Sequence, residues 1–217
     1  MFRAVLFTQW KWSRGPLAVA ACATFAIPFL SIRGGHTVFE GLDARGVLSL
    51  MQEWGFAYSI GAMSLGLIAG LIAWRADHAG RHVYALSLPI DRWRYTLMRY
   101  GAGALTLAAP MITLWLGAMI AVHTATIPLG LHAYPTGLAL RFVLAALLAY
   151  SLCFAAGSTS PRVAGYALGT LGTIIVVNLV IEGTTGHSGT MDAFRGLLFD
   201  RYGLLHVFTG RWMLIDV

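Results

Sequence analysis

Five runs along the chain are apolar enough and long enough to cross a bilayer. The hydrocarbon core is about 30 Å thick, and a helix needs about 20 apolar residues to span it with every backbone polar group paired. The predicted spans are residues 15–32, 54–74, 101–122, 137–156 and 163–181. The pattern therefore predicts an all-α integral membrane protein, with about five transmembrane helices forming one domain over residues 15–181.

The segments on either side of this domain are amphipathic. Residues 1–14 have one apolar helical face, which consists of Phe2, Val5, Leu6 and Trp10. This spacing predicts an N-terminal amphipathic interfacial helix that lies along the inner leaflet. Residues 182–217 carry apolar side chains at near-helical spacing, interrupted by charges and glycine, and are predicted to lie at the outer surface.

The distribution of charge sets the orientation. Apolar residues make up 58% of the chain and charged residues only 11%, as expected of a membrane protein. With a cytoplasmic N-terminus, the predicted inside segments hold nine arginine and lysine residues against two acids. The positive-inside rule favours this orientation, in the pattern of a bacterial inner (cytoplasmic) membrane protein. Topology accounts for the basic excess, so no nucleic-acid partner is expected.

The long cytoplasmic loop, residues 75–99, is predicted to contain a short helix. Pro89 suits a first helical position, and Asp91 favours the helix dipole in the first turn. One face of this helix would be apolar, with Ile90, Trp93, Leu97 and Tyr100, and the opposite face cationic, with Arg92 and Arg99. Two interpretations stay open: the loop rests on anionic lipid, or it docks into a soluble partner.

A resemblance bears on this choice. The loop reads "ALSLPIDRWRYTLMRYGAG" and leads into the third predicted span. Its Leu88, Pro89, Arg92 and Tyr95, together with the order of helices, resemble the permease subunits of type-2 ABC exporters. In that family a coupling helix in this loop seats in a groove of a separate ATPase subunit.

The resemblance implies a set of partners and contacts. The chain would be a transmembrane permease subunit of an ATP-driven exporter, paired in the bilayer with a second permease as a homodimer or heterodimer. ATP and magnesium would bind the partner ATP-binding-cassette subunit, and no cofactor would bind this chain. The implied ATPase contact comprises Leu86, Ser87, Leu88, Pro89, Ile90, Asp91, Arg92, Trp93, Arg94 and Tyr95.

The chain departs from that family in its number of spans. The family usually has six spans, whereas five are predicted here. The segment "GLLHVFTGRW" resembles the outside region that precedes the sixth span, which would then be missing from the chain or supplied by another. A non-transporting membrane scaffold or assembly subunit is the alternative function.

Glycines at four-residue spacing predict close helix packing. Such spacing lets helix backbones approach within the subunit or across a dimer interface. The predicted packing residues are Gly66, Gly70, Gly165, Gly169 and Gly172. Pro28 and Pro110 are expected to loosen the spans that contain them.

No pattern in the sequence indicates an enzyme. Lys11 is the only lysine and lies outside any GxxxxGK[ST] motif, so a phosphate-binding loop of that type is absent and ATP hydrolysis is expected on a partner. His78 and His82 have helical ligand spacing but no third ligand nearby. Arg141 lies about one turn from the outer end of its span and is expected to snorkel to the interface.

Overall fold

The computed structural model describes five segments of the chain, residues 2–36, 44–79, 91–124, 130–158 and 212–216, and isolated positions at 127, 166, 169, 170, 173, 177, 203 and 205–208. The chain divides into two compact units, of which the first comprises Met1–Phe154 with Arg211–Val217 and the second Ala155–Gly210. The second unit contains a described 3-10 turn, η1 (His206–Phe208).

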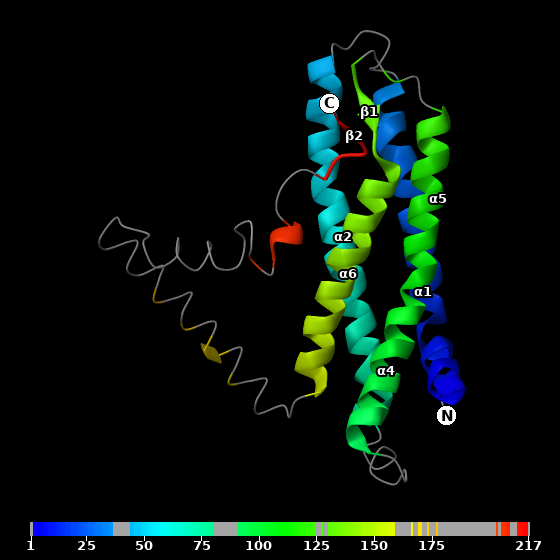
Figure 1. Ribbon diagram of the computed structural model, residues 1–217, viewed down its shortest axis with the longest axis vertical. Helices are drawn as coiled ribbons and strands as arrows, with labels where there is room; N and C mark the ends of the chain where they lie inside the picture. Colours follow the sequence, from blue (N-terminus) through cyan, green and yellow to red (C-terminus); the bar gives the residue numbers. More distant parts are fainter. Residues whose placement is uncertain are drawn as a thin grey trace. The chain divides into compact units, whose positions relative to one another are not determined.

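Long apolar helices make up the first unit, which confirms the prediction of an all-α membrane protein (Figure 1). They are α1 (Phe2–His36), α2 (Ala44–Ala79), α4 (Arg92–Thr106), α5 (Ala108–Thr124) and α6 (Pro135–Ser158). Among the described residues, four helical stretches are long and apolar enough to cross a membrane, with α4 and α5 forming one of them. The count is four and not five, and the fifth predicted span, residues 163–181, lies almost wholly outside the described residues.

The N-terminal segment belongs to the same helix as the first span, and its position along the inner leaflet stays a prediction. Residues 2–14 form the first turns of α1, which continues without a break to His36. Gln9 and Ser13 are buried, while Trp10 and Trp12 are exposed. Two polar side chains of this segment therefore pack inside the protein, whereas its basic side chains, Arg3, Lys11 and Arg14, are exposed.

The loop between the second and third spans is shorter than predicted. Helix α2 reaches Ala79 and α4 begins at Arg92, so the helical ends extend into the predicted loop of residues 75–99. Helix α4 runs through to Thr106 instead of ending before the third span. The break comes at Leu107, three residues before Pro110, because proline has no N–H to donate to the Thr106 carbonyl.

Helix α1 packs against α5, α4 and α2. At Gly117 of α5, an added Cβ would lie 2.5 Å from the Phe25 carbonyl oxygen, so the two backbones meet where a side chain has no room. Nearby, Thr24 Oγ1 lies 3.0 Å from both the Pro110 carbonyl oxygen and Thr113 Oγ1. Close packing and a hydroxyl contact therefore join α1 to the third span.

Helix α2 packs against α6 through two of the glycines that the sequence singled out. A Cβ at Gly66 would lie 2.3 Å from the Ala146 carbonyl oxygen, and one at Gly70 would lie 2.7 Å from Cys153 Cβ. The Trp74 indole N–H also donates to the Phe154 carbonyl at 2.9 Å. These glycines thus serve packing within the subunit.

The end of the chain returns to this unit. Strand β2 (Ile215–Asp216) pairs antiparallel with β1 (His132–Ala133), at the end of the helices opposite the N-terminus (Figure 1). Trp212 is buried, and the Arg141 guanidinium lies 5.0 Å above its ring. Arg141 therefore has a cation–π contact within the protein, a partner that the sequence did not indicate.

Candidate functional site

The first turn of α4 presents charge and an indole at its surface. Asp91 is the N-cap residue but makes no capping hydrogen bond with its side chain. Its Oδ2 lies 3.4 Å from Arg94 Nε in an exposed ion pair, and the Arg94 guanidinium lies 5.2 Å above the Trp93 ring. Trp93 is 60% exposed. An exposed ion pair contributes little to stability, so these groups are available for an intermolecular contact.

Further along α4, Arg99 points into the protein. Its side chain is only 8% exposed. It donates from Nε to the Ala73 carbonyl of α2 and from a terminal nitrogen to the Tyr95 hydroxyl. The guanidinium also lies 5.7 Å from the ring centroids of Trp74 and Tyr95. The sequence placed Arg99 with Arg92 on the cationic face of this helix, but the structure separates them: Arg92 is exposed, and Arg99 is buried, because hydrogen bonds and ring contacts replace its hydration.

An aromatic cluster adjoins Arg99. The Tyr100 ring lies 5.2 Å from that of Tyr150 and 5.3 Å from that of Phe154, whose ring is 4.9 Å from Trp74. The Tyr150 hydroxyl donates to the Tyr100 carbonyl at 3.0 Å. Rings of α2, α4 and α6 therefore meet beside the buried guanidinium, and the start of α4 is fixed to both neighbouring helices.

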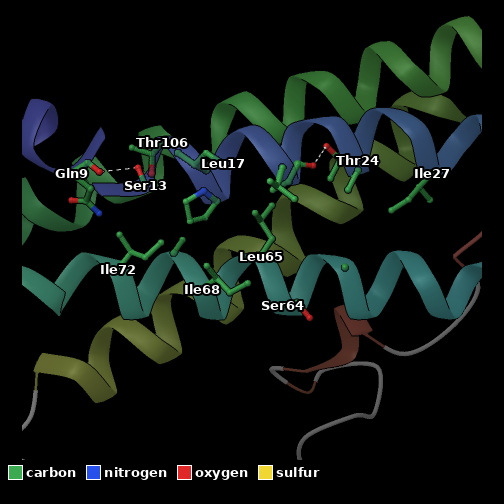
Figure 2. A pocket seen from close by; sticks show the side chains of 16 residues that line it. Gln9, Ser13, Leu17, Thr24, Ile27, Ser64, Leu65, Ile68, Ile72 and Thr106 are labelled. Carbon is green, nitrogen blue, oxygen red and sulfur yellow. Dashed lines mark hydrogen bonds between the residues drawn. The ribbon is translucent and has the colours of Figure 1, made fainter. Parts of the chain in front are cut away.

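A groove of about 550 Å³ lies between α1 and α2 (Figure 2). Most of its wall is aliphatic, and Leu17, Leu65 and Ile68 face the space. Thr106 of α4 contributes at the end near Gln9. A second, smaller cavity, of about 410 Å³, is lined by the start of α1 and by Leu105, Thr106 and Ala109.

The residues of the implied ATPase contact fall into three groups. Leu86, Ser87, Leu88, Pro89 and Ile90 lie outside the described residues. Asp91, Arg92, Trp93 and Arg94 are exposed at the start of α4, whereas Tyr95 is buried beneath Arg99. Surface residues and an inward-facing tyrosine therefore follow one another within a single helical turn.

The predicted packing glycines also divide. Gly66 and Gly70 lie against α6. At Gly169, no atom of a more distant described residue lies within 4 Å of the position that a Cβ would take. Gly165 and Gly172 lie outside the described residues.

Sequence reasoning missed the polar groups inside the helices. Gln9, Ser13 and Thr24 are buried on one side of α1. Their spacing follows the helical repeat, and this was the available signal, but the apolar residues between them concealed it.

No protein-family model, no curated protein and no solved structure matches the chain.

Proposed function

We propose that the chain is the membrane-spanning permease subunit of an ATP-driven exporter, coupled through residues 86–95 to a separate ATP-binding subunit. The observation that supports this most is the path of α4. The helix starts at an exposed turn, Asp91–Arg94, and runs unbroken to Thr106 inside the bundle. A helix of this length transmits a displacement of its first turn along its axis.

Arg99 supplies the link from that first turn to the spans. Its hydrogen bond to the Ala73 carbonyl ties α4 to α2, and Tyr100 and Tyr150 tie α4 to α6. Movement of an ATPase bound at Arg92 and Arg94 would therefore be carried to α2 and α6 together. In this proposal Tyr95 does not touch the ATPase but holds Arg99 in place.

We expect substitution of both Arg92 and Arg94 by alanine to weaken binding of the ATPase by at least about tenfold, because arginine side chains often dominate such interfaces. The measurement is co-purification of an ATP-binding-cassette subunit with the chain from its native membrane, followed by ATPase activity of the complex. Lys11→Ala combined with Arg14→Ala is the matched control, since it also removes two exposed basic side chains.

Two results would contradict the proposal. One is purification of the intact native assembly with no ATP-hydrolysing subunit. The other is equal ATPase recovery for the Arg92/Arg94 variant and the Lys11/Arg14 variant. Recovery of other integral membrane proteins alone would instead favour the scaffold function.

A further inference from the structure

The groove between α1 and α2 offers few hydrogen-bonding groups to a bound molecule. Three of its hydroxyl groups have backbone partners, because Ser13 Oγ donates to the Gln9 carbonyl at 2.8 Å, Thr24 Oγ1 lies 2.9 Å from the Ala20 carbonyl, and Thr106 Oγ1 donates to the Gly103 carbonyl at 2.7 Å. The fourth hydroxyl, that of Ser64, points away from α1 (Figure 2). The remaining wall is mainly alanine, leucine and isoleucine. A hydrocarbon chain would satisfy such a surface better than a polar molecule.

The groove has the length and position of a lipid chain site. It runs along α1 from Gln9 to Ile27, which is about 27 Å at the helical rise of 1.5 Å per residue. Val19 and Ile68, on its wall, are exposed and lie within membrane-spanning helices. The groove is therefore open toward bilayer hydrocarbon, and its volume falls within the range of about 300–1,000 Å³ usual for ligand sites.

A basic side chain, Arg75, lies beside one end of the groove, close in sequence to the lining residue Ile72. The Arg75 guanidinium lies 5.3 Å above the ring of Trp12, one turn of α1 from Gln9. Arg75 ends the second span, where headgroups are found. The first half of α1 contains no acidic residue that would repel a phosphate. A guanidinium stacked on an indole keeps edge N–H groups for an oxyanion, and this geometry matches a phosphate.

We propose that this groove binds an anionic phospholipid, with an acyl chain between α1 and α2 and the phosphate at Arg75 beside Trp12. Charge complementarity at the Arg75 end selects the headgroup, and the aliphatic walls hold the chain. The site is independent of the proposed transport function, and the lipid acts as a bound structural ligand.

The test uses the full chain in vesicles of equal parts phosphatidylglycerol and phosphatidylcholine. Two samples are compared: in one the phosphatidylglycerol carries a photoactivatable diazirine on its acyl chain, and in the other the phosphatidylcholine does. Cross-linked peptides are mapped by mass spectrometry. We expect the phosphatidylglycerol probe to label α1 and α2 at the groove in preference to the phosphatidylcholine probe. Arg75→Gln should lower that preference about fivefold, whereas Lys11→Gln, which removes another exposed base near the same end of α1, should preserve it.

A second pair of variants tests whether the lipid acyl chain lies in the groove. Ala20 lines the groove, whereas Ala18 is exposed on α1 and lines no part of it. Ala20→Phe should abolish groove labelling and Ala18→Phe should leave it intact. Ala23→Phe, at another lining residue of α1, replaces Ala20→Phe if that variant fails to fold.

Three outcomes overturn the proposal. The first is equal labelling of the native chain by the two lipid probes. The second is equal labelling of the Ala18→Phe and groove-filling variants. The third is a disulfide between two copies of an Ala20→Cys variant, which would show that a second copy covers the groove. Loss of the ATPase interaction, by contrast, would contradict the transport function and leave the lipid site standing.

Discussion

Gly66→Leu is expected to destabilise the protein strongly. An added Cβ would lie 2.3 Å from the Ala146 carbonyl oxygen and 2.8 Å from the Tyr150 backbone nitrogen. These are backbone atoms of a helix, so they cannot rotate away as a flexible side chain would. Helices α2 and α6 must separate, and overpacking of this kind costs about 3 kcal/mol. Thermal unfolding of the purified chain in one detergent measures the loss.

Gly15→Leu is the matched control for this prediction. Gly15 also lies within a helix, but no atom lies within 4 Å of the position that its Cβ would take. Leucine there should leave stability unchanged or raise it by up to about 1 kcal/mol, because glycine is a poor helix former. Equal unfolding temperatures for the two variants would show that α2 and α6 do not meet at Gly66.

Arg99→Ala is expected to lower the free energy of unfolding by about 2 kcal/mol. The substitution removes hydrogen bonds to the Ala73 carbonyl and the Tyr95 hydroxyl, and it leaves a cavity beside Trp74. Arg99→Lys should recover only part of the loss, because an ammonium group lacks the planar surface that lies over the two rings. The measurement is again thermal unfolding, together with quenching of Trp fluorescence by a water-soluble quencher.

Arg92→Ala serves as the control for Arg99. Arg92 is exposed on the same helix, and its loss should change stability by no more than about 0.5 kcal/mol. If Arg99→Ala and Arg92→Ala unfold at the same temperature, then the contacts of Arg99 contribute no net stability. In that case Arg99 does not fix α4 to α2, and the route proposed for coupling is lost.

The two stability predictions bear on function in different ways. Gly66 fixes the distance between α2 and α6, whereas Arg99 fixes the start of α4 to α2. A variant of Arg99 that still folds should therefore bind an ATPase through Arg92 and Arg94 but couple it poorly. In that variant, ATPase binding and transport are measured separately. Normal ATPase binding with reduced transport would show that Arg99 acts in coupling and not in binding of the ATPase.

Some features followed from the sequence because they depend on local composition. Continuous apolar runs predict membrane helices, since an unpaired backbone group in hydrocarbon costs several kcal/mol whatever the neighbours are. The first four spans were predicted on this basis, with ends that differ from those of the helices by several residues. Pro110 was likewise expected to loosen its span, and the helix is interrupted at Leu107, whereas α1 continues past Pro28, so the missing N–H alone does not decide where a helix breaks.

Other features depended on which helices lie beside one another. Periodicity gave α4 an apolar face containing Trp93 and Leu97, and the expectation was that the basic face would be exposed. In the structure Trp93 and Leu97 are exposed and Arg99 is buried, because Arg99 finds hydrogen-bond acceptors at Ala73 of α2 and Tyr95 of α4. The same inversion applies to α1, where Gln9 and Ser13 are buried and Trp10 is exposed.

The sequence by itself determined that this is a helical membrane protein, where its first four spans lie, and that Gly66 and Gly70 belong to a close packing surface. Each of these depends on short-range hydrophobicity or on the size of one side chain. Only the tertiary structure decided that Arg99 meets Ala73 and that Arg75 meets Trp12, because these pairs are 26 and 63 residues apart in sequence. The groove between α1 and α2 is likewise a property of two packed helices, and no single segment encodes it.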